Sequence, residues 1–403
     1  MQTALSDAYR DTPLGREAEA LLRACVHCGF CTATCPTYRL LGDERDSPRG
    51  RIYLIKQLLE GRPVSRLTQH HLDRCLTCRA CETTCPSNVG YGRLVEIGRQ
   101  LLERRVERPW RERLVRWLLR RWLPHPRPFA LALGLARPLA PWLPVALPPR
   151  QKPAPRPAGR HRRRMLVLEG CVQSVATPAT NAAAARVLHR LGITLESPPG
   201  QGCCGAVSHH LSAEEEALAF MRRNIDAWWP AIEAGAEAIV VSASGCGLMV
   251  KEYGERLADD PRYAHKARRV SSLARDLVEV LAAEPLERLG CRPPDRPLAL
   301  HLPCTLQHGQ GLGESLRRVL QRLGFELLPV ADEHLCCGSA GTYSLLQPEL
   351  SRRLRDDRLA ALQAHGPARI VTANVGCQLH LQGGAQVPVC HWIELVAEYL
   401  PPE

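Results

Sequence analysis

Two cysteine runs with the same spacing near the start of the sequence limit what this chain can fold into. Each run reads C-x2-C-x2-C-x3-C-P, and together they contain eight of the 18 cysteines. Two-residue gaps let three thiolates bind three corners of one 4Fe–4S cube, while the fourth cysteine faces away and binds the other cube. The spacing therefore predicts two 4Fe–4S clusters, one on Cys25, Cys28, Cys31 and Cys85, the other on Cys75, Cys78, Cys81 and Cys35.

Zinc and disulfides are the other uses of closely spaced cysteines. Zinc ribbons need two Cys-x2-Cys pairs but neither a third cysteine nor a Cys-Pro ending. Residues 1–16 carry Asp7 and Asp11 and lack an apolar stretch, so we expect no signal peptide and no secreted disulfide scaffold. A zinc-stabilised docking scaffold is the competing interpretation. Paired clusters carry single electrons between a two-electron catalyst and an acceptor, so we expect electron transfer and no catalytic residue on this chain.

The C-terminal part of the sequence is a duplication. Residues 186–192 (RVLHRLG) and 318–324 (RVLQRLG) share six of seven residues. Apolar segments that we interpret as strands surround them at 165–168, 193–195 and 238–241 in the first copy, and at 298–302, 325–330 and 368–371 in the second. Apolar strands that alternate with amphipathic helices predict parallel sheets covered by helices.

Each copy of the duplication carries four cysteines at equivalent positions. They are Cys171, Cys203, Cys204 and Cys246 in the first copy, and Cys304, Cys336, Cys337 and Cys377 in the second. The adjacent pair precedes a glycine, which allows a close backbone approach. The cysteines also follow strands, where α/β folds bind ligands. We predict that these eight cysteines bind a cofactor, the candidate being an additional iron–sulfur centre; buried structural cysteines or a redox-active thiol pair are the alternatives.

Other residues near these motifs receive no cofactor role. Met249 and His380 stand where a Cys-x2-Cys ending would supply a fifth thiolate, and we interpret His380 as an ordinary polar residue. Cys291 and Cys390 have no counterpart in the other copy and are interpreted as ordinary thiols. Residues 309–313 begin like a dinucleotide-binding loop, but Glu314 replaces the third glycine, so we expect no flavin or nicotinamide on this chain.

A basic, tryptophan-rich stretch lies between the two cysteine regions and accounts for much of the formal charge of +12. In residues 104–123, Trp110, Leu114 and Trp117 share one face of a predicted helix, and arginines fill the rest. The helix is expected to pack on its own domain or a partner flavoprotein, or to contact an anionic membrane surface. Nucleic-acid binding is not expected, because the aromatic residues are confined to the apolar face. No apolar run of about 20 residues predicts a membrane span.

Several motifs together resemble the iron–sulfur subunits of glycolate oxidase. Besides the two cysteine runs, the likeness rests on residues 10–13, 47–53, 303–310, 335–343 and 391–395, and it covers nearly the whole chain outside 104–164. Iron–sulfur subunits of anaerobic glycerol-3-phosphate dehydrogenase, lactate-utilisation proteins and heterodisulfide reductase share the Cys-Cys-Gly unit more loosely. Heterodisulfide reductases use five cysteines for each unusual cluster, whereas each copy here offers four.

The resemblance implies a role in a complex. FAD-binding dehydrogenase subunits would oxidise glycolate to glyoxylate, and electrons would pass through this chain to a quinone or other membrane acceptor. D-Lactate and glycerol-3-phosphate are the alternative substrates. The chain is expected in the cytoplasm, at the inner face of the cell membrane.

The predicted fold class is multidomain. We expect an α-helical two-cluster ferredoxin domain at residues 1–100 and a basic, Trp- and Pro-rich linker at 101–164. Two repeated α/β Cys-Cys-Gly units with parallel sheets are expected at 165–290 and 291–403.

Overall fold

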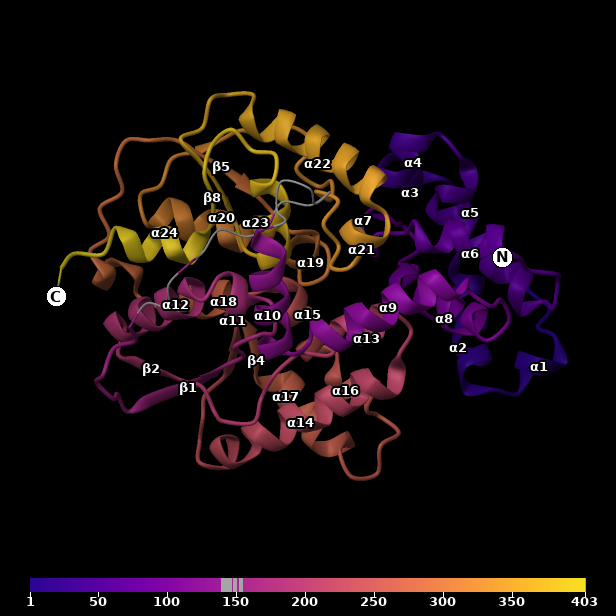
Figure 1. Cartoon of the computed structure of the whole chain (residues 1–403), viewed down its shortest axis with the longest axis horizontal. Helices are drawn as coiled ribbons and strands as arrows, with labels where there is room; N and C mark the ends of the chain where they lie inside the picture. The colour runs from indigo at the N-terminus through magenta and orange to yellow at the C-terminus, as the bar shows by residue number, and fades with distance from the viewer. Residues whose placement is uncertain (139–146, 148–150, 152–154, 403) are drawn as a thin grey trace. The chain divides into compact units, whose positions relative to one another are not determined.

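The computed structural model describes residues 1–138, 147, 151 and 155–402 (Figure 1). They form two compact units. The first contains Met1–Trp117 and His334–Arg358, and the second contains Leu118–Glu333 and Leu359–Glu403. A segment from late in the sequence thus belongs to the same unit as the N-terminal cysteine runs.

The first unit is helical. Its longer helices are α2 (Pro13–Ala24), α5 (Pro48–Leu59), α6 (Arg66–Asp73) and α8 (Tyr91–Glu103), with α1 (Asp7–Arg10) at the start. Short helices follow the cysteine runs: α3 (Phe30–Ala33), α4 (Pro36–Leu41) and α7 (Ala80–Thr83). The Ser47 hydroxyl accepts a 3.0 Å hydrogen bond from the Gly50 amide and caps α5, with Pro48 at its first position. Ser47 and Pro48 thus fix where this helix begins.

The second unit contains two four-stranded parallel sheets. The first has the order β2-β1-β3-β4, with β1 (Arg163–Val167), β2 (Ile193–Glu196), β3 (Ile239–Val241) and β4 (Ala274–Asp276). The second has the order β6-β5-β7-β8, with β5 (Leu298–His301), β6 (Leu327–Leu328), β7 (Arg369–Thr372) and β8 (Val389–His391). The predicted parallel sheets and the two-copy fold class are confirmed.

The repeat extends one strand further than the sequence pattern indicated. Strands β4 and β8 have three residues each, too few to show a period, and were missed. Asp276 caps helix α18 (Leu277–Ala282) after β4, and His391 caps helix α24 (Trp392–Glu398) after β8. Strand β6 is shorter than the expected 325–330.

The two copies share one hydrophobic core in the second unit. Val167 and Val240 from the first sheet and Leu300 and Val371 from the second belong to the same buried cluster. Polar contacts join the copies as well: the amide of Ser244 donates to the Ala373 carbonyl at 3.1 Å. The two sheets therefore share one core.

Helix α9 (Trp110–Trp122) presents its apolar face to solvent. Trp110, Leu114 and Trp117 are 67%, 45% and 49% exposed. The charged side faces the protein, because Arg116 and the preceding Arg108 both pair with Asp73. Packing of the apolar face on its own domain, one of our expectations, is therefore not what the described residues show. No helix in the described part of the chain is long and apolar enough to cross a membrane.

Candidate iron–sulfur centres

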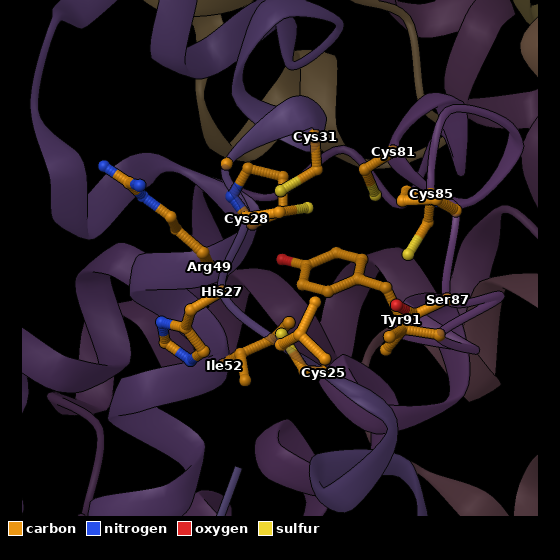
Figure 2. A pocket seen from close by; sticks show the side chains of 15 residues that line it. Cys25, His27, Cys28, Cys31, Arg49, Ile52, Cys81, Cys85, Ser87 and Tyr91 are labelled. Atoms are coloured by element: carbon orange, nitrogen blue, oxygen red, sulfur yellow. The ribbon is translucent and has the colours of Figure 1, made fainter.

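The first cluster site is a pocket lined by thiols in the first unit. Five cysteines line it: Cys25, Cys28, Cys31, Cys81 and Cys85 (Figure 2). The pocket encloses about 430 Å³, including its open mouth. Soft thiolate ligands suit iron–sulfur clusters, so this donor set fits the expected group. Cys85 comes from the second run and shares this pocket with three cysteines of the first run, as does Cys81; the crossed ligation stays a prediction.

The backbone of both runs adopts the left-handed conformation at equivalent positions. His27 and Thr77 have φ of 56° and 51°, and Gly29 and Arg79 have φ of 90° and 60°. This conformation costs a residue with a side chain about 1–2 kcal/mol. It turns amides toward sulfur: the Thr77 amide lies 3.4 Å from the Cys75 sulfur. The strain thus accompanies the folding of each run around its thiols.

The second cluster site is more deeply enclosed. Cys35, Cys75 and Cys81 are 6–8% exposed, whereas Cys28 of the first site is exposed. The pKa of the Cys81 thiol is raised by burial first and then by the charges of Cys78, Cys75 and Cys35. The structure thus brings together the four cysteines predicted for the second cluster.

The two sites differ in their electrostatics. Burial alone would raise the pKa of the Cys75 thiol, but the charges of Arg51 and Arg99 and the Tyr91 hydroxyl, 3.5 Å from the sulfur, lower it overall. At the first site, burial raises the pKa of Cys31 to about 11. Arg51 and Arg99 thus place positive charge beside Cys75 of the second site, and positive charge favours the reduced, more negative state of a cluster.

Arg51 is the centre of a buried network beside the second site. It is 1% exposed, and its guanidinium pairs with the fully buried Asp46 at 3.2 Å. It also donates to the Thr37 hydroxyl at 3.1 Å, and that hydroxyl lies 3.3 Å from the Cys35 sulfur. The sequence analysis missed this role, because nothing in residues 47–53 indicates that the Arg51 side chain is buried.

The segment 334–358, which contains the second Cys-Cys-Gly triplet, belongs to the same unit as this site. Tyr343 on α21 (Tyr343–Leu346) is buried, and its hydroxyl has no hydrogen-bond partner among the described residues. Its pKa is raised by burial first, and the charges of Arg51, Cys75 and Cys336 also act on it. Tyr343 therefore lies close enough to Cys75 of the second cluster site and to Cys336 for the charges of both to act on it.

The first Cys-Cys-Gly set forms a compact thiol cluster in the second unit. The sulfurs of Cys171 and Cys203 are 3.5 Å apart, and Cys204 is hydrogen-bonded to both Cys203 and Cys246. Gly205 has φ of +94°, and a Cβ there would lie 3.0 Å from the Ala217 carbonyl oxygen on α14 (Glu214–Glu233). The glycine thus permits the close approach inferred from the sequence.

Two side chains that the sequence analysis missed hold this turn. Asn224 on α14 donates to the Cys203 carbonyl at 2.8 Å and accepts from the Gly202 amide at 2.8 Å. Tyr253 on α16 (Tyr253–Arg256) donates to the Cys204 carbonyl at 2.9 Å. Both are buried. Met249, in the place of a fifth thiolate, belongs to the buried apolar cluster under this site.

The second Cys-Cys-Gly set is divided between the units. Cys304 begins α19 (Cys304–Gln307) and Cys377 lies on α23 (Val375–Gln382), both in the second unit. Cys336 and Cys337 are buried in the first unit. Gly338 follows them with φ of +87°, and a Cβ there would lie 2.6 Å from the Ser351 carbonyl oxygen. The triplet thus has the same turn in both copies.

The unassigned cysteines pack as ordinary side chains. Cys291 and Cys390 lie against the core of the second unit. Burial raises the pKa of Cys291 to about 11 and that of Cys390 to about 12. Such thiols stay protonated and unreactive at neutral pH, in agreement with their interpretation as ordinary thiols.

Comparison with known proteins agrees with these sites. Residues 21–89 match the family model of the 4Fe-4S dicluster domain, and residues 165–251 and 298–382 match the cysteine-rich domain CCG. The chain is 57% identical to the glycolate oxidase iron-sulfur subunit of Escherichia coli K12, with 100% of both chains covered. It is 29% identical to the probable glycolate oxidase iron-sulfur subunit of Bacillus subtilis 168, over 92% of this chain and 90% of that one.

More distant likenesses cover the fold or part of the chain. Lactate utilization protein A of Bacillus licheniformis is 25% identical over 53% of this chain and 88% of its own length. A hypothetical protein from Helicobacter pylori has a crystal structure with a TM-score of 0.55 and 10% identity, covering 98% of this chain and 74% of that one. At that identity the structural match concerns the fold alone.

Proposed function

Because the chain belongs to the family of glycolate oxidase iron–sulfur subunits, we propose that it passes electrons from FAD-binding partner subunits to a quinone or other membrane acceptor. The chain is the iron–sulfur, electron-transfer subunit of an oxidoreductase complex of the glycolate oxidase family, and it carries two 4Fe–4S clusters. The observation that carries the proposal is the pair of four-thiol sites within one unit. The zinc-scaffold alternative is disfavoured, because residues 21–89 match a 4Fe–4S family.

The chemistry divides between the partner and this chain. Oxidation of glycolate to glyoxylate releases two electrons and two protons, which a flavin on the partner accepts together. Clusters accept one electron at a time. Two neighbouring sites on this chain therefore suit the transfer of the pair in single steps. Relatives named for glycolate oxidase favour glycolate over D-lactate or glycerol-3-phosphate as the substrate.

The structure supports an order for the relay. Cys28 of the first site is exposed, and Val26 and Phe30 beside it are 67% and 62% exposed. A partner can therefore approach this site closely. The second site is buried, has the cationic surroundings that favour a reduced cluster, and neighbours Tyr343 and Cys336. We assign the first site to exchange with the partner and the second to exchange with the Cys-Cys-Gly region.

We also assign an additional iron–sulfur centre to the Cys-Cys-Gly region. The donor set of the first copy, Cys171, Cys203, Cys204 and Cys246, is buried and contiguous. For the second copy, Cys304, Cys336, Cys337 and Cys377, the assignment rests on the repeat. We keep the division into 1–100, 101–164, 165–290 and 291–403 as functional regions, although residues 334–358 belong to the N-terminal compact unit.

The division of chemistry predicts that this chain alone does not oxidise glycolate. Purified chain with both clusters reconstituted should reduce no artificial acceptor in the presence of glycolate. Addition of the flavoprotein that co-purifies with it from the native host should restore turnover, measured as glyoxylate formed. Turnover by the isolated chain would contradict the proposal, and so would a partner that turns over equally well in its absence.

Contact with a membrane is proposed for helix α9. Its exposed face carries Trp110, Leu114 and Trp117, and exposed arginines Arg111 and Arg113 lie beside them. Tryptophan rings and arginines together suit the headgroup region of an anionic bilayer. The chain would then work in the cytoplasm at the inner face of the membrane, close to its acceptor.

A vesicle experiment tests this contact. The full chain should sediment with phosphatidylglycerol-containing vesicles but not with pure phosphatidylcholine, and high salt should release it. The double substitution Trp110→Ser and Trp117→Ser should abolish binding. Trp229→Ser, which removes a tryptophan from α14 outside this face, should leave binding intact. Equal binding of the double variant and the unchanged chain would refute the contact.

A further inference from the structure

An arginine next to the first Cys-Cys-Gly set has unused hydrogen-bond donors. Arg223 lies on α14, directly before Asn224, which holds the cysteine turn. Its Nε and Nη2 atoms are buried and have no hydrogen-bond partner among the described residues. A buried donor without a partner costs about 1–3 kcal/mol, more when it is charged. Such a group is normally satisfied by a ligand.

The Arg223 guanidinium lies against the backbone of Gly202, where a residue with a side chain would not fit. A Cβ on Gly202 would lie 2.0 Å from Nη2 of Arg223, so any larger residue would displace the guanidinium. The other side of the group is fixed, because its Cζ lies 4.9 Å from the centre of the Phe220 ring. The backbone immediately before the cysteine pair and the aromatic ring thus hold the charge beside the thiols.

The thiol that follows Gly202 in the chain is Cys203, which is fully buried. A bound cluster would concentrate negative charge at this place, since four thiolates and several sulfides outweigh the iron charge. Arg223 is therefore positioned as a cation beside an anionic centre.

We propose that Arg223 supplies the positive counter-charge, and two N–H donors, for an anionic iron–sulfur centre held by Cys171, Cys203, Cys204 and Cys246. This inference rests on the proposed metal centre in the first copy. It adds that Arg223 is a positioning residue that tunes the centre. Reduction adds a negative charge, which Arg223 stabilises, so the residue raises the reduction potential of the centre.

The test compares variants of the full chain after anaerobic reconstitution with iron and sulfide. The two ferredoxin-type clusters account for eight iron atoms, so the extra centre appears as iron above eight and as an EPR signal that Cys204→Ser removes. Arg223→Met should lower the midpoint potential of that signal. We expect at least a tenfold shift in its reduction equilibrium, about 59 mV for one electron. Arg223→Lys should retain most of the potential.

Two further variants separate this role from a structural one. Gly202→Ala keeps the arginine but displaces its guanidinium, and should lower the potential in the same direction. Arg222→Met changes the neighbouring arginine, which instead pairs with Asp260 at 2.8 Å, and should leave the potential unchanged. Circular dichroism confirms folding of each variant, and if Arg223→Met does not fold, Gly202→Ala carries the test.

Three outcomes would overturn the proposal. They are an unchanged potential in both Arg223→Met and Gly202→Ala, an equal change in Arg222→Met, and an iron content of eight with no further signal. Failure of the proposed function looks different. In that case the reconstituted complex would not oxidise glycolate, while the potentials of the isolated chain would still respond to Arg223.

Discussion

Cys35→Ala is expected to remove one 4Fe–4S cluster and leave the other intact. Cys35 belongs to the first cysteine run, yet it lies with Cys75, Cys78 and Cys81 of the second. Without its thiolate the second cluster has three ligands, whereas the first keeps Cys25, Cys28, Cys31 and Cys85. Ferredoxin-type iron should fall to about half, and electron transfer from the partner should stop. Iron analysis and EPR of the reduced protein measure this loss.

The reciprocal variant and a control sharpen the result. Cys85→Ala should remove the first cluster instead, because Cys85 lines the pocket with Cys25, Cys28 and Cys31 (Figure 2). Cys291→Ser lies outside both sites and should retain all the iron. Loss of the first cluster's signal in Cys35→Ala would show that each run binds its own cluster and that the crossed assignment is wrong.

Arg51→Met is expected to destabilise the first unit by about 3–5 kcal/mol, the usual cost of breaking a buried ion pair from one side. Asp46 is fully buried, and the substitution removes one of its two arginine partners; Arg74 and the His71 ring remain. The carbonyl of His71 also loses its 2.8 Å hydrogen bond from Arg51. Urea denaturation of the full chain, followed by helical circular dichroism, measures the change in free energy of unfolding.

The same substitution should change the second cluster in particular. The Arg51 charge lowers the pKa of Cys75, so its removal should lower the midpoint potential of that cluster and leave the first unchanged. Arg45→Met is the matched control. Arg45 pairs with Asp43 at 2.7 Å on the surface, next to Asp46 in the chain, and its loss should change the free energy of unfolding little. Equal stability of Arg51→Met and Arg45→Met would refute the structural role of this network.

Much of the fold could be predicted from sequence because its signals are local or repeated. The strands found at 165–168, 238–241, 298–302 and 368–371 are short apolar runs that recur in both copies, and the structure confirms them as β1, β3, β5 and β7. The three-residue strands β4 and β8 were missed, because their length shows no period.

The orientation of helix α9 shows the limit of pattern reading. Periodicity identifies Trp110, Leu114 and Trp117 as one face, and the usual expectation is that such a face packs on the protein. In this structure the helix has the opposite orientation. Arg108 and Arg116 pair with the Asp73 carboxylate, and the apolar face is exposed to solvent. An ion pair between residues 35 or more positions apart leaves no trace in local periodicity.

The sequence by itself determined the two cysteine sets that we propose as ligands and the chemistry expected of them. Cysteine spacing is a local property, and the repeat compares positions within one chain, so the thiol sets and the two-copy fold follow from residue order. Only the tertiary structure decided which residues surround those thiols. Asp46 and Arg74, Arg223 and Gly202, and Tyr343 and Cys75 are brought near one another by packing of segments that are distant in the sequence. Their charges act through space, which residue order does not record.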